Sequence, residues 1–235
     1  MESTYKRILL KISGEALAGN QKTGIDFETV KPIAKAVKKC SEIGAEISIV
    51  VGGGNFWRGR TSGKMNRVRA DHMGMMATVM NALGLADAIE EEGLTVKVMT
   101  AVPFPQISDY YSPEKAIHHL KKGRIVIFGY GTGSAFFSTD TAASLRASEI
   151  NADIILKATS VDGVYDSDPD TNPNAKKYEE VTFEEVLSKN LQVMDSTAAA
   201  MCRDNKIPVL VFSLNDPYNI VRALEGKSLG TLAKP

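Results

Sequence analysis

The chain has 235 residues, of which 43% are apolar, and its 28 basic and 28 acidic residues cancel to give no net charge. This apolar content is enough for one large core, so we expect a single domain over residues 1–235. Nucleic-acid binders usually carry a basic excess, which this chain lacks, and no apolar run reaches the ~18 residues of a membrane span. The charged start, Met1–Lys11, does not match a signal peptide and predicts a cytoplasmic protein.

Short apolar segments rich in Ile and Val alternate with amphipathic segments along the chain. The apolar segments are typical of strands buried on both faces of a parallel sheet, and they cover residues 7–12, 45–51, 94–101, 124–129, 153–158 and 208–213. Helical spacing of apolar residues predicts helices over residues 28–43, 71–92, 112–121, 139–150, 195–205 and 216–225. The alternation predicts an α/β fold in three layers, with a doubly wound, mostly parallel sheet and helices on both faces. The two cysteines, Cys40 and Cys202, fall in helical segments and are predicted to be buried free thiols.

Residues 160–181 interrupt this alternation with glycine, proline, asparagine and aspartate. They predict a long loop that has room for a hairpin, and long loops in compact domains often serve function. Three aspartates between positions 166 and 170 resemble the start of a calcium loop. Thr171 and Lys177 replace the glycine and glutamate that such a loop requires, so the sequence argues against calcium there.

Three glycine-rich segments each follow a predicted strand, and they are Lys11–Glu15, Gly52–Asn55 and Gly129–Gly133. Ligands of open α/β sheets bind outside the carboxyl ends of the strands, where glycine lets backbone amides approach an anion. Any one of these segments could be only a tight turn. Three of them at one edge of a sheet favour a polyphosphate site.

Neither familiar nucleotide-binding fingerprint is present. Arg58 stands where a P-loop ending at Gly63–Lys64 needs its first glycine, and Ser134 stands where a Rossmann motif needs its last. A nucleotide site in this chain must therefore be of another type.

Two basic residues are candidates for binding an anion. Lys11 lies at the end of an otherwise apolar strand, where contact with a phosphate is favoured over extension into solvent. Arg58 opens a run with no acidic residue, Arg58–Arg69, directly after a glycine segment. Such a run is often only a solvated face, but this position favours an anion-steering role for Arg58.

Asp71 and Asp140 each stand near a predicted helix start, so each could be a helix N-cap. Alternatively, Asp71 could accept hydrogen bonds from a ribose, and Asp140 could organise cations and water around a transferring phosphate. The sequence leaves both alternatives open. The histidines show no metal-site spacing, and the methionines between 73 and 80 predict core or subunit contact.

Taken together, these segments resemble a known family. The segments Lys11–Glu15, Gly52–Gly59, Ala70–Met75, Gly131–Asp140 and Lys157–Tyr165 are similar to those of the bacterial uridylate kinases, a branch of the amino-acid-kinase family. The strand lysine and the triple glycine are shared by the wider family. The segments around Asp71–Gly74 and Phe136–Phe137 are more specific to the uridylate branch, and the resemblance spans nearly the whole chain.

The resemblance implies phosphoryl transfer from ATP to UMP, which gives ADP and UDP in pyrimidine nucleotide biosynthesis without a covalent intermediate. It also implies a magnesium requirement and a homohexamer. Within the single domain it implies an acceptor-nucleotide half, about residues 1–155, and an ATP half, about residues 156–235.

The site residues that the resemblance implies fall into three groups. The catalytic residues would be Lys11, Arg58 and Asp140. The residues that hold ATP would be Lys11, Ile12, Ser13, Gly14, Gly54, Arg58, Thr159, Tyr165 and Asp168. The residues that hold UMP would be Gly53, Asp71, Thr132, Gly133, Ser134, Ala135, Phe136, Phe137, Ser138 and Thr139, with Asp71 on the ribose hydroxyls.

Two departures from the family pattern concern binding and regulation. Ser134–Ala135 replaces the usual Asn-Pro, which affects a subunit-bridging or uracil-side contact. Many relatives are activated by GTP, and the resemblance also implies inhibition by UTP. Ala86 and Glu90 stand where relatives often carry basic residues for the effector, so the resemblance does not decide GTP activation.

Two other functions compete with this interpretation. A kinase of the same family could phosphorylate a carboxylate or carbamate, but Asp71 and the paired phenylalanines count against that acceptor. A nucleotide-sensing regulator or an oxyanion storage shell could share the fold without catalysis. The presence of Lys11, Arg58 and Asp140 counts against a loss of catalysis.

Overall fold

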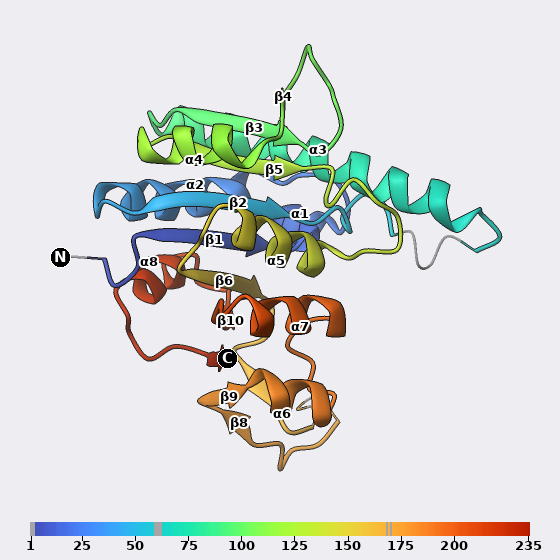
Figure 1. Ribbon diagram of the computed structural model, residues 1–235, viewed down its shortest axis with the longest axis vertical. Coiled ribbons are helices and arrows are strands. Elements are labelled where there is room, and N and C mark those ends of the chain that lie inside the picture. The colour runs from blue at the N-terminus through green and yellow to red at the C-terminus, as the bar shows by residue number, and fades with distance from the viewer. Residues whose placement is uncertain (1–2, 59–62, 168, 170) are drawn as a thin grey trace.

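A nine-stranded sheet forms the centre of the molecule. The structure is a computed structural model, and it describes residues 3–58, 63–167, 169 and 171–235. The strands are Arg7–Ile12 (β1), Glu46–Val51 (β2), Val96–Thr100 (β3), Asp109–Tyr110 (β4), Ile125–Gly129 (β5), Ile154–Thr159 (β6), Glu180–Thr182 (β9), Val209–Ser213 (β10) and Thr231–Lys234 (β11). Their order is β4-β3-β5-β2-β1-β6-β10-β11-β9, which runs from top to bottom in Figure 1. Neighbouring strands are parallel except for β10 and β11.

Helices cover both faces of this sheet. One face carries α2 (Phe27–Glu42), α3 (Arg67–Glu91) and α8 (Asn219–Leu224). The other face carries α4 (Pro113–Lys121), α5 (Thr139–Glu149), α6 (Phe183–Ser188) and α7 (Ser196–Asp204). Of these, α4, α5 and α7 lie in front of the sheet in Figure 1. The short helices α1 (Gly14–Ala18) and η1 (Gly19–Gln21) connect β1 to α2.

Alternate residues of the central strands pack into opposite layers. In β1, Ile8, Leu10 and Ile12 join the core on the α2 side, whereas Leu9 joins the core on the α5 side, and all four are fully buried. Complete burial of such a side chain is worth about 1.5–3 kcal/mol, so both layers hold the sheet in place. The predicted three-layer, mostly parallel α/β fold is confirmed.

Each long apolar or amphipathic segment of the sequence forms the predicted strand or helix, with its ends shifted by a few residues. The prediction missed the short elements α1, α6, β4, β9 and β11, whose few residues give little periodicity. The predicted loop over residues 160–181 does contain a hairpin, formed by the antiparallel strands β7 (Val164–Tyr165) and β8 (Lys177–Tyr178).

The two cysteines are buried free thiols, as predicted. Burial raises the pKa of Cys40 to about 12 and the pKa of Cys202 to about 11. In the part of the chain that the structure describes, no helix combines the length and apolar character needed to cross a bilayer.

The parallel arrangement brings five loops to one edge of the sheet. Because β1, β2, β5, β6 and β10 run in the same direction, the segments that follow them all emerge at their carboxyl ends. Strands from both halves of the chain contribute to this edge, which is where the sequence predicted a ligand site.

Candidate active site

The three glycine-rich segments meet around one cleft of about 400 Å³ at this edge, as predicted. We call it the glycine cleft, and the start of α3 and the segment before α5 complete it. Its lining consists of Lys11, Ser13, Gly14, Glu15, Gly52, Gly53, Gly54, Trp57, Arg58, Arg67, Asp71, Gly74, Met75, Thr78, Gly131, Thr132, Phe136, Phe137, Ser138 and Thr139. Cations, glycine backbone and two carboxylates, Glu15 and Asp71, therefore share a single cavity.

The glycines of the first two loops are required because the backbones touch. A Cβ on Gly14 would lie 2.5 Å from Asn55 Oδ1 and 2.8 Å from the Gly54 nitrogen. A Cβ on Gly53 would lie 2.5 Å from the Gly74 carbonyl oxygen of α3. Any side chain at either position would push β1, β2 and α3 apart, so these glycines fix the shape of the cleft.

A buried pair of side-chain amides, Asn55 and Asn81, holds the second glycine loop in place. Asn55 Nδ2 donates to Asn81 Oδ1 at 2.9 Å, and Asn81 Nδ2 donates to Asn55 Oδ1 at 2.7 Å. Asn81 also donates to the Gly52 carbonyl, and Asn55 donates to the Gly24 carbonyl. Because both side chains are buried and fully engaged, the loop keeps its conformation without a ligand.

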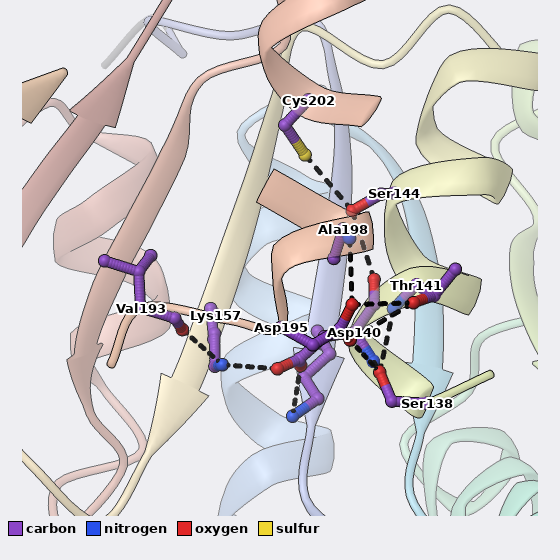
Figure 2. Close-up of polar contacts among 10 residues, drawn as sticks. Ser138, Asp140, Thr141, Ser144, Lys157, Val193, Asp195, Ala198 and Cys202 are labelled. Atoms are coloured by element: carbon purple, nitrogen blue, oxygen red, sulfur yellow. Dashed lines mark hydrogen bonds and ion pairs between the residues drawn. The ribbon is translucent and has the colours of Figure 1, made fainter. Parts of the chain in front are cut away.

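One carboxylate lies between two lysines beside the glycine cleft, and of these three residues only Lys11 is in the described lining of the cleft. Lys11 Nζ is 2.8 Å from Asp140 Oδ1, and Lys157 Nζ is 2.7 Å from Asp140 Oδ2. Figure 2 shows Lys157 pointing at Asp140 and at the Val193 carbonyl, which accepts a hydrogen bond from Lys157 at 2.5 Å. The three charged side chains are only 12–17% exposed. They form one cluster with one more positive than negative charge.

The environment of this cluster shifts the pKa values of Asp140 and Lys157. Burial acts to raise the pKa of Asp140, but the adjacent Lys11 and Lys157 ammonium groups outweigh it and lower that pKa below the ordinary value. Burial also lowers the pKa of Lys157, and the neighbouring Asp140 carboxylate opposes this effect. Asp140 is therefore an anion at neutral pH, held by its two cationic neighbours.

The helix that carries Asp140 is capped by another residue. Ser138 Oγ accepts hydrogen bonds from the Asp140 and Thr141 amides at 3.0 and 3.1 Å, so the N-cap interpretation of Asp140 is wrong. Ser138 in turn donates to Asp195, which also accepts from Thr141 Oγ1 at 3.1 Å and from the Ala198 amide at 2.9 Å (Figure 2). One carboxylate thus fastens the starts of α5 and α7 together.

Asp71 lies within α3 and not at its start. Asn66 caps the helix, so the N-cap interpretation of Asp71 is wrong. Asp71 accepts from Arg67 Nε at 2.8 Å and from the Phe136 amide at 2.9 Å, and Phe136 has a left-handed backbone with φ of 71°. This carboxylate connects α3 to the segment before α5 and lines the cleft.

Arg58 also faces a carboxylate, because its guanidinium forms an ion pair with Glu15 of α1. Both side chains are largely solvent-exposed, so this pair is weak and an incoming anion can compete with Glu15. Arg58 lines the glycine cleft and also a neighbouring cleft of about 710 Å³ that lies outside β6 and β10.

The structure divides the remaining predicted site residues among several places. Thr159 lines the neighbouring cleft together with Ser13, and Tyr165 lines a separate pocket of about 300 Å³ beside the β7–β8 hairpin. Ile12 is fully buried, with its carbonyl accepting from the Gly52 amide. Gly133, at the end of the third glycine segment, and the two residues after it, Ser134 and Ala135, are not in the described lining of the cleft, and neither is Asp140. Asp168 lies outside the described residues.

Several side chains that shape the site were not predicted from the sequence. The sequence pattern could have indicated Lys157, because this lysine interrupts an apolar strand in the same way as Lys11 does. Glu15 and Arg67 lie beside predicted residues, but their ion pairs depend on the folded geometry. Asp195 and Asn81 contact partners more than 25 residues away, and no local pattern predicts those contacts, although Asp195 also caps α7 at the start of a predicted helix.

Among the described residues, no group of three or more histidine, cysteine or acidic side chains could hold a metal ion. Magnesium commonly binds through substrate phosphates together with one or two carboxylates, and it then needs no such protein cage. The site therefore has no dedicated metal cage among these residues, and a magnesium ion here would depend on a bound nucleotide.

Comparison with known proteins places this geometry in a family. Residues 6–213 match the model of the amino acid kinase family. The fold is similar to UMP kinase from Bacillus anthracis, with 39% identity and a TM-score of 0.95 over 98% of this chain and 96% of that one. It is also similar to UMP kinase from Ureaplasma parvum, with 40% identity and a TM-score of 0.93 over the whole of both chains. Uridylate kinase from Archaeoglobus fulgidus matches at 27% identity and a TM-score of 0.74 over 96% of this chain and 99% of that one. The chain belongs to the amino acid kinase family.

Proposed function

We propose that the protein transfers the γ-phosphoryl group of ATP to UMP, giving ADP and UDP for pyrimidine nucleotide synthesis in the cytoplasm. The observation that carries this proposal is the convergence of Lys11, Arg58 and three glycine loops on a cleft that also contains Asp71. UMP kinases from two bacteria that resemble this chain along nearly its full length support the choice of acceptor.

The proposed reaction needs no general base. The attacking group is a phosphate oxygen of UMP, which is largely ionised near neutral pH. It forms a bond to the γ-phosphorus while the bond from that phosphorus to the β-phosphate oxygen breaks, and the electron pair leaves with ADP. The main barrier is the repulsion between two anions brought into line, so catalysis consists of positioning and charge stabilisation.

The residues of the glycine cleft fit this task. Lys11 and Arg58 both line the glycine cleft, and Arg58 also lines the neighbouring cleft. In the proposal Lys11 binds the transferring phosphate while Asp140 holds its ammonium group in place. Arg58 exchanges its exposed partner Glu15 for a phosphate oxygen. Backbone amides around Gly14 and Gly54 complete the anion site.

The proposed nucleotides occupy neighbouring parts of this edge. ATP is proposed to extend from Ser13 and Gly14 toward Thr159 in the neighbouring cleft and toward Tyr165 beside the hairpin. UMP is proposed to lie between Asp71 and the segment 132–139. Magnesium is proposed to enter as the ATP complex, where it neutralises part of the phosphate charge.

The direct test of this function is UDP formation from ATP and UMP by the purified chain. A panel of nucleoside monophosphates, carboxylates and carbamate as acceptors tests the choice of substrate. Preference for a carboxylate or carbamate would identify a different kinase of the same family. Failure to form ADP with any acceptor would favour a sensing or storage role.

Regulation by GTP and UTP is proposed from the resemblance alone, and the same assay tests both effectors. Ala86 and Glu90 line a separate pocket of about 430 Å³ between α3 and β3, together with Asp87, Lys97 and Asp109. Three carboxylates against one lysine do not favour a triphosphate at this place. Activation by GTP would therefore have to use other residues.

The first substitution test concerns Asp71. We expect Asp71→Asn to weaken UMP binding while leaving ATP binding unchanged, because an amide is a poorer acceptor for ribose hydroxyls than a carboxylate. Calorimetric titration with each nucleotide measures the two effects separately. Asp87→Asn, at an exposed position on the same helix, is the matched control. Equal loss of both ligands would indicate that Asp71 only connects α3 to Phe136.

The proposed homohexamer is supported by an exposed apolar stripe along α3. Met73, Met76, Met80 and Leu83 recur at helical spacing and are 37–52% exposed, whereas Met75 points into the core. A stripe of this kind on a charged surface is typical of a protein interface. We expect the double substitution Met76→Glu and Met80→Glu to reduce the particle mass measured by light scattering. An unchanged mass would exclude this stripe from the assembly.

A further inference from the structure

Lys157 occupies a position equivalent to that of Lys11 on the neighbouring strand. The two lysines are paired in the register of the parallel strands β1 and β6, and both side chains reach α5 on the same face of the sheet. A lysine inside an apolar strand is costly to bury, so its charge needs a partner. Both lysines find that partner in Asp140.

The two lysines differ in what else they can reach. Lys11 lines the glycine cleft, whereas Lys157 does not belong to the described lining of that cleft. The Nζ atom of Lys157 instead contacts Asp140 Oδ2 and the Val193 carbonyl oxygen (Figure 2). Lys157 therefore connects β6, α5 and the segment before α7, and the partner it shares with Lys11 is Asp140.

We propose that Lys157 is a positioning residue: it fixes the Asp140 carboxylate and supplies its countercharge, so that Lys11 keeps its own charge available for phosphate. This inference rests on the proposed phosphoryl transfer at the glycine cleft. The two lysines share the Asp140 carboxylate: Oδ1 lies 2.8 Å from Lys11 Nζ, and Oδ2 lies 2.7 Å from Lys157 Nζ.

The charge balance of the cluster explains why a second lysine is needed. With Lys157 in place, two ammonium groups share the Asp140 carboxylate, so Asp140 neutralises Lys11 only in part, although the nearby Asp195 carboxylate offsets some of the positive charge of Lys157. Without the charge of Lys157, Asp140 neutralises Lys11 fully, and an incoming phosphate must compete with that ion pair. In a site this poorly exposed, such competition is strong.

The other titratable groups near Asp140 do not replace Lys157. They are Asp195 at the start of α7 and Cys202 within α7. Asp195 adds negative charge, and burial keeps the Cys202 thiol neutral at ordinary pH because it raises the pKa to about 11. In the described surroundings of Asp140, the stabilising positive charges are thus Lys11 from β1 and Lys157 from β6.

The main experiment uses Lys157→Gln, which removes the charge but keeps a donor for the Val193 carbonyl. We expect kcat for UDP formation to fall by roughly 10–100-fold, the range typical for loss of an outer partner of a functional group. The KM for UMP should change little, since UMP contacts other residues. Lys234→Gln, which removes a lysine of the exposed Lys234–Glu180 pair on β11, is the matched control and should leave kcat unchanged.

The pH profile separates a charge role from a merely structural one. The lysines lower the pKa of Asp140 in the folded protein. Loss of the Lys157 charge should raise that pKa, so the acidic limb of kcat should move to higher pH in Lys157→Gln. Lys157→Arg retains the charge and should restore the acidic limb toward its original position. A fall in kcat without any shift of the limb would contradict the proposal.

A double-mutant cycle tests whether Lys157 acts through Asp140. In an Asp140→Asn background the effect of Lys157→Gln on kcat should largely disappear, because the carboxylate is already gone. Equal effects in both backgrounds, or normal turnover in Lys157→Gln, would overturn the inference.

Failure of the proposed function would be distinguishable from failure of this inference. If the unmodified chain makes no UDP, the function is wrong, and two measurements without turnover still decide the role of Lys157. Calorimetric titration with ATP should show weaker binding to Lys157→Gln than to the Lys234→Gln control. A carbon-13 NMR titration should show Asp140 ionising at higher pH in Lys157→Gln. Unchanged ATP affinity and an unchanged Asp140 titration would each contradict the inference.

Discussion

Replacing Asp140 by alanine is expected to lower the free energy of unfolding by about 3–5 kcal/mol, the cost of removing one partner from a buried ion pair. The variant leaves the Lys11 and Lys157 ammonium groups close together, poorly hydrated and without the carboxylate that both now contact. Urea unfolding followed by circular dichroism measures the loss. Turnover should fall as well, because Lys11, which lines the cleft, loses the carboxylate that holds its ammonium group.

The pH dependence of this loss follows from the lowered pKa of Asp140 in the folded protein. The stabilisation by Asp140 is fully present above pH 3.8, which is the ordinary pKa of an aspartate. It disappears as the pH falls through the lower pKa that Asp140 has in the folded protein. The difference in stability between the original chain and Asp140→Ala should therefore shrink in strong acid. Asp204→Ala, which removes an exposed partner of Arg203, should cost only ~0–1 kcal/mol. A similar cost for both variants would show that the cluster does not stabilise the fold.

Replacing Lys11 by alanine is expected to cut kcat for UDP formation by about 10²–10³-fold while leaving the fold intact. A preorganised donor at a developing negative charge is typically worth about 3–4 kcal/mol of barrier, which corresponds to this factor. The fold should survive because Asp140 keeps Lys157 as its partner at 2.7 Å. Steady-state kinetics measures the loss, and thermal unfolding checks the fold.

Lys6→Ala is the matched control for this substitution, since Lys6 is an exposed lysine at the opposite end of β1 from the cleft. It should leave kcat unchanged. Turnover of Lys11→Ala close to that of the Lys6→Ala control would remove Lys11 from the mechanism.

The sequence predicted the architecture because the long elements repeat their signal many times. The apolar run of β1 and the helical spacing in α2 each give several consistent residues, and their alternation specifies the layers. Elements such as β7 and α6 have too few residues to show a period. The register that places Lys11 beside Lys157 is a long-range pairing that no local pattern contains.

The helix starts show why part of the site could not be predicted. Asn66 and Asp71 are both good N-cap residues, as are Ser138 and Asp140, so sequence preference does not choose between the members of each pair. The structure selects Asn66 and Ser138, and this choice leaves Asp140 in the first turn of α5 and Asp71 as the fifth residue of α3, where each contacts a basic side chain. Asp195 contributes through a serine 57 positions away along the chain.

The junction made by Asp195 limits how the molecule can move when it binds ligands. Its carboxylate joins Ser138 and Thr141 of α5 to the first turn of α7, so these two helices behave as one rigid unit at their amino ends. Any closing motion that separated them would have to break several partly buried hydrogen bonds. We therefore expect any closing motion that brings donor and acceptor together to leave this junction intact.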